Sequence, residues 1–213
     1  MIICNDFEQG TPEWFAARLG IPTASSFDKL ITPTGKPSSQ AKGYMCELLA
    51  EWLLNRDVKS FAGNEWTERG QALEPEARAQ YEFITDRQIN TVGIVYMDDR
   101  KLVSASPDGL AFDAGTESYM HGLEIKSPSP AVHVEYLLSD TMPDKYKAQV
   151  QGSMLVTDLD RWDFVSYHPD MDPAIITVRR DEKFIKTLSD ILDQFVDEML
   201  EKREKLINGS VAA

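Results

Sequence analysis

Two short stretches decide the fold: "SPDG" at Ser106–Gly109 and "LEIKSP" at Leu123–Pro128. The first places Asp108 at a turn, just before an apolar run that is typical of a strand. The second is itself a short apolar strand. Alternate side chains of a strand point to opposite faces, so Glu124 and Lys126 share one face. A hairpin between the two strands would bring Asp108 beside Glu124, which predicts a sheet with two carboxylates and one ammonium group in one place.

Such a cluster of charges favours a divalent cation. Two neighbouring carboxylates repel each other, which raises the pKa of one of them unless a cation binds both. Mg²⁺ binds through one or two carboxylates together with water and phosphate oxygens, as a nuclease site requires. Lys126 would then orient the attacking water or offset charge building on the phosphate. The alternative is that the loose Glu-x-Lys pattern is only the solvated face of an exposed strand.

The remaining sequence predicts helices on both sides of a strand-rich centre. Thr11 and Pro12 favour a helix start, and apolar residues at helical spacing favour a long terminal helix. Pro75 is expected to kink or restart the helix that carries Glu74. Helices are predicted over residues 12–19, 23–31, 39–55, 131–138, 143–156 and 181–206, and strands within 89–99, 101–113, 122–128, 161–169 and 174–180.

The fold class that follows is α/β, with a central mixed sheet flanked by helices. We expect one domain over residues 1–213, with a helical N-terminal part (1–60), a catalytic core (64–180) and a C-terminal helix (181–206). The 2 cysteines exclude a disulfide framework and a four-cysteine metal or iron–sulfur site. The N-terminus lacks the pattern of a signal peptide and no apolar run reaches membrane-spanning length, so a cytoplasmic location without membrane attachment is expected.

The net charge of -13 argues against a general nucleic-acid binder. Its distribution weakens that objection. Between Arg18 and Lys42 the charged residues are four basic ones and only one acid, Asp28, whereas acidic residues concentrate in the terminal helix. A locally basic surface can hold a phosphate backbone even on an acidic chain, and bound Mg²⁺ would cancel negative charge at an acidic site.

Several motifs occur in an order that resembles one family. They are Glu74, the Ser106–Asp108 and Glu124–Lys126 motifs, the pattern Tyr146-x-Ala-Gln149-Val-Gln151, and the opening "EWFAARLGIPTASSF" at residues 13–27. Together they closely resemble the phage lambda exonuclease, or YqaJ-like viral recombinase, family of the PD-(D/E)XK nuclease superfamily. The resemblance spans residues 11–167. This chain carries Pro75 directly after Glu74, which bears on the exact role of that acid.

The resemblance implies a role for each matching residue. Asp108, Glu124 and the main-chain carbonyl of Ile125 would bind metal, Glu74 would assist through a second metal or a bound water, and Lys126 would be the catalytic lysine. The residues that match a pocket for the DNA 5′-phosphate are Arg18, Thr23, Ser25, Ser106 and Gln149, and Tyr146 and Gln151 match positions that would support the active site. From the residues alone, Arg18 could instead be a surface helix residue and Ser25 a simple N-cap.

The implied activity is Mg²⁺-dependent degradation of one strand of linear duplex DNA from its 5′ end, with Mn²⁺ as a substitute and two ions per site when DNA is bound. The products would be 3′ single-stranded overhangs for phage-type recombination. The family also implies a ring-shaped homotrimer and a single-strand annealing protein as partner, in the cytoplasm of a bacterial cell. Two alternatives stay open: another nuclease of the superfamily, RecB-like or a structure-specific endonuclease, and an inactive DNA-binding or scaffold protein.

Overall fold

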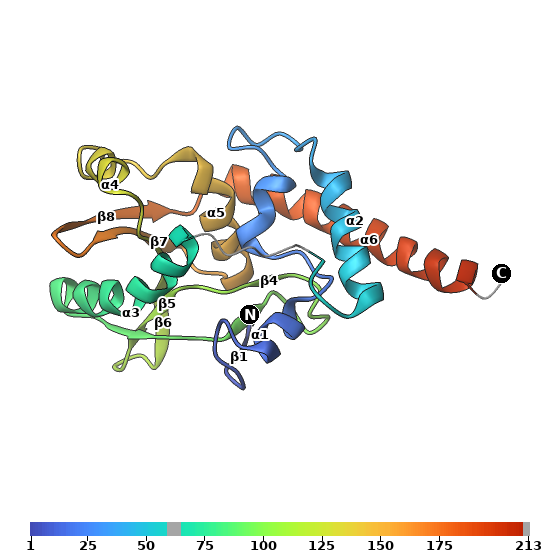
Figure 1. The fold of residues 1–213 in the computed structure, drawn as a ribbon, viewed down its shortest axis with the longest axis horizontal. Coiled ribbons are helices and arrows are strands. Elements are labelled where there is room, and N and C mark those ends of the chain that lie inside the picture. The colour runs from blue at the N-terminus through green and yellow to red at the C-terminus, as the bar shows by residue number, and fades with distance from the viewer. Residues whose placement is uncertain (59–64, 211–213) are drawn as a thin grey trace.

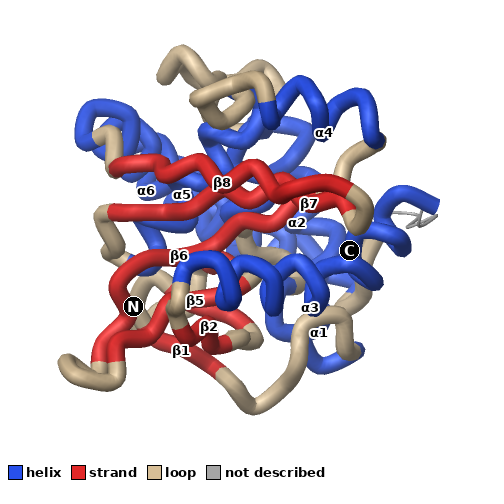
Figure 2. The backbone as a smooth tube through the Cα atoms, turned by 90° about the vertical axis from the view of Figure 1, so that its left-hand side faces the viewer, coloured by secondary structure: helices blue, strands red, loops and turns tan. Residues whose placement is uncertain are grey.

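The computed structural model describes residues 1–58 and 65–210. Its larger sheet has five strands in the order β2 (Gln88–Asn90), β5 (Gly109–Asp113), β6 (Ser118–Lys126), β7 (Arg161–His168) and β8 (Met171–Arg179). β6 and β7 are parallel, and the other neighbours are antiparallel. Figure 2 shows these strands side by side. The predicted α/β architecture with a central mixed sheet is therefore confirmed.

A second sheet was not predicted. It joins β1 (Ile2–Cys4), β3 (Ile94–Tyr96) and β4 (Ser104–Ala105), all antiparallel. The sequence had assigned residues 1–60 to a helical part, and β1 corrects that assignment. Three residues are too few to show a strand period, and β1 exists because its backbone pairs with β3, about ninety residues away in the chain. The predicted boundary between residues 60 and 64 lies outside the described residues.

The helices follow the predicted ranges with local differences. They are α1 (Pro12–Arg18), the 3₁₀ segment η1 (Ala24–Lys29), α2 (Ala41–Leu54), α3 (Glu65–Thr85), α4 (Pro130–Leu137), the 3₁₀ segment η2 (Asp144–Tyr146), α5 (Lys147–Thr157) and α6 (Glu182–Ser210). Thr11 caps α1, where its side chain accepts a hydrogen bond from Trp14 N. The segment predicted as a helix over 23–31 is a shorter 3₁₀ turn.

The helix that carries Glu74 does not restart at Pro75. α3 continues as one element from Glu65 to Thr85 with Pro75 inside it. A proline removes the hydrogen bond to the carbonyl four residues earlier. Pro75 and Gln71 are both exposed, so water can satisfy the carbonyl of Gln71 that loses its donor.

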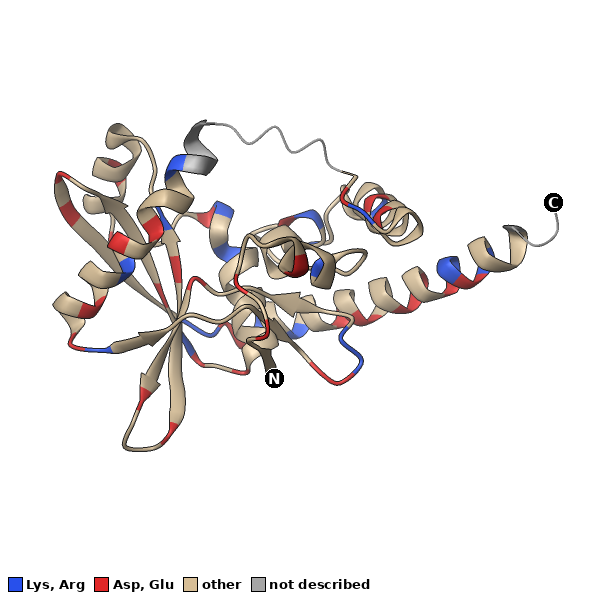
Figure 3. Ribbon diagram, turned by 60° about the horizontal axis from the view of Figure 1, so that its bottom comes forward, with Lys and Arg blue, Asp and Glu red and all other residues tan. Residues whose placement is uncertain are grey.

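Helices cover both faces of the larger sheet (Figures 1 and 2). α3 packs on one face over β6 and β7, where Ala77 and Tyr81 meet Leu123, Ile125 and Val165. α5 and α6 lie on the other face, and α6 extends from the body toward the C-terminus (Figure 1). Asp and Glu recur along the middle of α6 on its outward side (Figure 3). Among the described residues, no helix is long and apolar enough to span a membrane.

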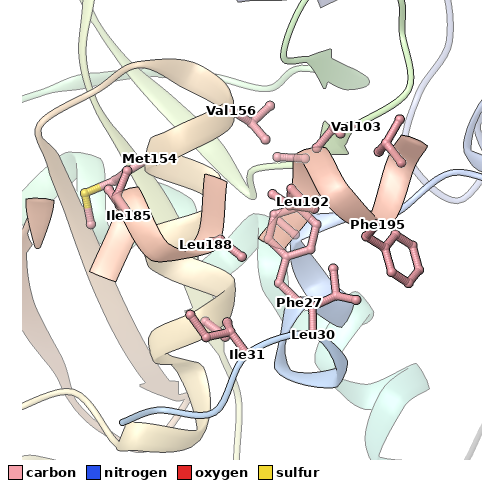
Figure 4. Close-up of a cluster of buried hydrophobic side chains, with 14 of the residues drawn as sticks. Phe27, Leu30, Ile31, Val103, Met154, Val156, Ile185, Leu188, Leu192 and Phe195 are labelled. Atoms are coloured by element: carbon pink, nitrogen blue, oxygen red, sulfur yellow. The ribbon is translucent and has the colours of Figure 1, made fainter. Parts of the chain in front are cut away.

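The main hydrophobic cluster joins the N-terminal segment to the two C-terminal helices. Figure 4 shows Phe27 of η1, Leu30 directly after it, Met154 of α5, and Leu188 and Phe195 of α6 around one buried volume. Each of these side chains is at most 5% exposed. The apolar stripe predicted for the terminal helix is thus the surface by which α6 packs. Burial of this cluster holds η1 beside the sheet that carries the charged residues.

Candidate active site

The hairpin of β5 and β6 builds the site. Gly109 lies opposite Leu123, and Asp108 N donates to Leu123 O over 3.2 Å. The backbone N of Ile125 donates to Asp108 Oδ2 over 2.6 Å. A Cβ added to Gly109 would lie 2.4 Å from Ile89 Cγ2, so the close packing of β2 here favours glycine. The predicted hairpin is confirmed, and it places the carboxylate of Asp108 at the backbone of β6, beside Ile125.

Glu124 and Lys126 form an ion pair in which Glu124 is buried and Lys126 is half-buried. The side chain of Glu124 is 2% exposed and makes an ion pair with Lys126. Glu124 Oε1 also accepts a hydrogen bond from Gln149 of α5, which donates from Nε2 over 2.6 Å. Burial raises the pKa of Glu124 to about 7, against the favourable charge of Lys126. The alternative of an exposed strand face is therefore wrong, because an exposed pair would not be desolvated.

Glu74 of α3 faces the same group of charges. Burial and the nearby carboxylate of Asp108 raise the pKa of Glu74 to about 7. Burial also raises the pKa of Asp108, although Lys126 opposes that change. Burial disfavours the charged form of Lys126, but the carboxylates of Glu124 and Asp108 outweigh burial and raise the pKa of Lys126. The structure thus brings the four residues predicted as catalytic into one electrostatically coupled cluster.

Two residues that the sequence analysis missed hold this cluster. Arg78 donates from Nε to the carbonyl of Asp108 over 2.9 Å and forms an ion pair with Glu74 through Nη2. Gln9 donates from Nε2 to the carbonyls of Val92 and Pro107, over 2.9 and 2.8 Å. Arg78 could have been found, because it follows Glu74 by four residues on a predicted helix. The placement of Gln9 depends on long-range packing and has no local signal.

The residues predicted to bind a 5′-phosphate form a second group around Arg18. Its Nη2 lies 3.3 Å from Thr23 Oγ1 and 3.2 Å from Ser25 Oγ, and the two hydroxyls are 3.1 Å apart. A cavity of about 320 Å³ opens here, lined also by Trp14 and Tyr44. Burial lowers the pKa of Arg18. Arg18 is therefore more than a surface helix residue, and Thr23 rather than Ser25 occupies the N-cap position of η1.

Ser106 connects this group to the hairpin. Its Oγ accepts a hydrogen bond from Trp14 Nε1 over 3.1 Å, and the guanidinium carbon of Arg18 lies 4.0 Å from the Trp14 ring centre. Ser106 is also only two residues before Asp108 in the chain. Gln149, by contrast, donates its hydrogen bond to Glu124. The structure therefore places Gln149 at the carboxylates.

The two residues predicted as active-site support separate. The Tyr146 ring centre lies 5.4 Å from Lys126 Nζ, so the ring borders the cluster. Gln151 points elsewhere: it donates to the carbonyl of Arg179 over 2.9 Å and accepts from Asp181 N over 2.8 Å. These bonds join α5 to the end of β8 and the start of α6. Two residues along a helix are about 200° apart, so Gln149 and Gln151 cannot both face the site.

The chemistry of the donor side chains shows whether a cation fits the site. Among residues 1–58 and 65–210, no three His, Cys, Asp or Glu side chains form a ready-made metal cluster. The donors are instead the two carboxylates of Asp108 and Glu124 with a nearby third, Glu74, and all three have raised pKa values. Few carboxylates plus water and phosphate oxygens suit Mg²⁺. The residues fit such an ion, which would stabilise the charged forms that burial now disfavours.

Comparison with known proteins gives the family. The profile of the YqaJ-like viral recombinase domain matches residues 13–160, more than half of the chain. The chain belongs to the YqaJ-like viral recombinase family. The match includes every residue of the carboxylate cluster and of the Arg18 group, so the resemblance inferred from the motifs is confirmed.

Solved structures place the family member among exonuclease folds. The alkaline exonuclease LHK-Exo from Laribacter hongkongensis is 30% identical, with a TM-score of 0.81 over 95% of this chain and 99% of that chain. LHK-Exo in complex with dAMP is similar to the same extent, with a TM-score of 0.80. A protein named ExoD from Escherichia coli (strain K12) is 32% identical over 63 residues, 28% of this chain and 72% of ExoD. Family and fold together support a nuclease.

Proposed function

We propose that this chain is a divalent-metal-dependent 5′-to-3′ exonuclease. It would degrade one strand of linear double-stranded DNA and leave 3′ overhangs for phage-type recombination by single-strand annealing. The observation that carries the proposal is the ion pair of the buried Glu124 with Lys126 beside Asp108, joined through Ser106 to the Arg18 group. One group has the chemistry to hydrolyse a phosphodiester, and the other has the chemistry to hold a terminal phosphate.

Each residue has a role that its surroundings support. Asp108, Glu124, the Ile125 carbonyl and Glu74 would hold Mg²⁺ or Mn²⁺, two ions when DNA is bound, and the metal would supply Lewis acidity and a nucleophilic water at neutral pH. Lys126 keeps its ammonium charged beside Glu124 and donates hydrogen bonds to the attacking water or the scissile phosphate. Gln149 holds the orientation of Glu124 by its amide.

The Arg18 group would select the end of the substrate. Arg18 offers a charged fork to phosphate oxygens, and Thr23, Ser25 and Ser106 add neutral hydroxyl donors. Because a terminal phosphate carries more negative charge than an internal one, the Arg18 guanidinium would favour 5′-phosphorylated ends over 5′-hydroxyl ends. This supports the proposed 5′-to-3′ direction.

The proposed larger assembly is the one that the family resemblance implies. We propose a single domain over residues 1–213, a homotrimeric ring around DNA, a single-strand annealing protein as partner, and action in the cytoplasm of a bacterial cell. A ring would retain its substrate by topology after any one contact is lost. That would offset the weak general attraction of an acidic chain for DNA.

The direct test is digestion of end-labelled linear duplex with Mg²⁺, comparing 5′-phosphate with 5′-hydroxyl ends and including a closed circle. The expected result is release of mononucleotides from 5′-phosphorylated ends and an intact circle. Cleavage of the circle would favour a structure-specific or RecB-like endonuclease. Binding without hydrolysis in Mg²⁺ and Mn²⁺ would favour an inactive DNA-binding protein.

A further inference from the structure

Arg78 joins two of the acids through different nitrogens. It lies on α3 one turn after Glu74, and its side chain is 15% exposed. Nη2 forms the ion pair with the carboxylate of Glu74, whereas Nε donates to the main-chain carbonyl of Asp108 over 2.9 Å. A single guanidinium therefore links the helix on one face of the sheet to the turn that begins β5.

The turn at Asp108 is held from several directions. Asp108 N and Oδ2 are bonded to the backbone of β6, at Leu123 O and Ile125 N. On the other side, Arg78 binds the carbonyl of Asp108, and Gln9 binds the carbonyl of Pro107. With these groups bound, rotation of the peptide between Asp108 and Gly109 would break a hydrogen bond to a charged donor, so the turn resists that rotation.

Arg78 also affects the orientation of the Glu74 side chain, through electrostatics. The carboxylates of Glu74 and Asp108 raise each other's energy, and repulsion would rotate the Glu74 side chain toward water. Arg78 opposes that rotation, because a planar fork can hold the Glu74 carboxylate and the Asp108 carbonyl at once. A lysine has a single point of attachment and cannot fix both groups in the same geometry.

We propose that Arg78 is a positioning residue that holds Glu74 and the Asp108 turn in the arrangement needed for a divalent cation. It touches neither substrate nor reacting atoms and acts through the two acids. This inference deepens the proposed function and rests on it for its kinetic part, but the binding of metal alone can be measured without any nuclease assay.

The test compares Arg78→Gln and Arg78→Lys with Arg100→Gln as a matched control. Arg100 also pairs with an aspartate, Asp98, but in an exposed turn after β3. Calorimetric titration of each protein with Mn²⁺ in the absence of DNA gives the metal affinity. We expect Arg78→Gln to weaken it by about 10- to 100-fold, as for other residues that orient metal ligands. Arg78→Lys should fall between Arg78→Gln and the wild type, and Arg100→Gln should match the wild type.

Kinetics and a double-mutant cycle separate positioning from general stability. On linear duplex, kcat of Arg78→Gln should fall by about 10-fold or more while KM for DNA stays within about twofold. In a Glu74→Gln background, the further loss caused by Arg78→Gln should be smaller than in the wild type, because part of its action passes through Glu74.

Each of three results would overturn the inference. Mn²⁺ affinity and kcat of Arg78→Gln within about twofold of the wild type would show that Arg78 only supports the fold. Full additivity with Glu74→Gln would show that Arg78 does not act through that acid. If Arg78→Gln does not fold, Arg78→Lys with unchanged Mn²⁺ affinity would count equally against the inference. A wild type that binds Mn²⁺ but digests no DNA would refute the proposed function and leave the Arg78 result standing.

Discussion

At the scale of single residues, the candidate site places carboxylates near one another in a buried environment, where their charged forms are disfavoured. Glu124 is almost fully buried, and the pKa of Glu124 and of Glu74 rises to about 7. Lys126 and Arg78 offset part of the repulsion without removing it. Binding of a cation would therefore lower the free energy of the site, because each carboxylate would then be stabilised in its charged form.

The first prediction concerns Asp108. Asp108→Asn should reduce hydrolysis of linear duplex by about 10³-fold or more, because a metal ligand is lost. The metal-free protein should melt at the same temperature or higher, because the amide oxygen can still accept from Ile125 N and the repulsion with Glu74 disappears. Gel assays of labelled duplex and thermal melts measure the two effects. Turnover close to that of the wild type would remove Asp108 from the site.

The second prediction concerns Arg18. Arg18→Gln should reduce kcat/KM on 5′-phosphorylated ends by about 10- to 100-fold, the value of one or two hydrogen bonds to a charged group. Rates on 5′-hydroxyl ends should hardly change. Lys36→Gln, an exposed lysine in the same basic stretch, is the control and should behave like the wild type. An equal loss on both kinds of end would contradict the assignment of a phosphate pocket.

At the scale of elements, close contacts between segments distant in sequence set the positions of the two residue groups. α5 approaches η1 at Gly152, where an added Cβ would lie 2.2 Å from the ring of Phe27. α3 is tied to the sheet by Tyr81, whose hydroxyl donates to Asp163 of β7 over 2.6 Å and contacts His121 of β6 at 2.9 Å. The first contact locates the Arg18 side of the site, and the second locates Glu74.

The third prediction tests the contact between α5 and η1. Gly152→Ala should lower the free energy of unfolding by about 1–3 kcal/mol, because the buried Phe27 ring must move to admit the methyl group. Gly43→Ala in α2 is the matched control, since nothing lies within 4 Å of its added Cβ, and it should stabilise by about 0.5–1 kcal/mol. Urea unfolding of both variants decides this. An unchanged free energy of unfolding for Gly152→Ala would mean that the Phe27 ring of η1 does not pack tightly against α5.

The fourth prediction tests the connection between α3 and the sheet through pH. Burial lowers the pKa of His121 to about 4, below the value of about 6.5 for an unfolded chain. Between these values the unfolded state binds a proton that the folded state does not, so stability is complete above pH 6.5 and is lost as the pH falls toward 4.

The comparison with His121→Gln isolates that loss. The wild type should lose up to about 3 kcal/mol more than the variant between pH 7 and pH 4. Urea unfolding at several pH values in this window gives the difference, in which the titration of other groups largely cancels. Parallel pH dependences for the two proteins would show that His121 is not buried as a neutral ring.

At the scale of the whole molecule, the net charge of -13 would disfavour binding of DNA to most of the surface. Five acids and no bases lie on α6 between Lys186 and Lys202, on the helix that extends from the body (Figures 1 and 3). An acidic exterior with a locally basic site suits a protein that meets DNA only at an end. It also suits an assembly that keeps its substrate by enclosure.

The fifth prediction concerns that assembly. Light scattering after size exclusion should give a mass of about 72 kDa, three times the 24.0 kDa of one chain. Addition of a short duplex should not change the number of chains. A mass of one chain at micromolar concentration would contradict the ring and would require processive digestion, if it is observed, to have another cause.

Much of the site could be predicted from the sequence because its chemistry is local. The turn before Asp108 and the alternation of Glu124 and Lys126 along one strand follow from backbone geometry alone. This does not hold for the bond of Arg78 to the Asp108 carbonyl, the placement of Gln9 or the true position of Gln151. Each depends on which segments pack together, and the same holds for β1, which is a strand only through its pairing with β3.

The α/β class, the hairpin and the family can be derived from the sequence, and so can the choice of the acids and the lysine as candidates. Periodicity, turn residues and ordered motifs are properties of neighbouring residues, so they can be read without the fold. Three features emerge only in the folded chain: Glu124 is buried, Arg78 binds both Glu74 and Asp108, and Gln149 contacts a carboxylate instead of the Arg18 group. Burial and long-range contacts arise from packing of the whole chain, and they set the electrostatic energy that makes these charges a site.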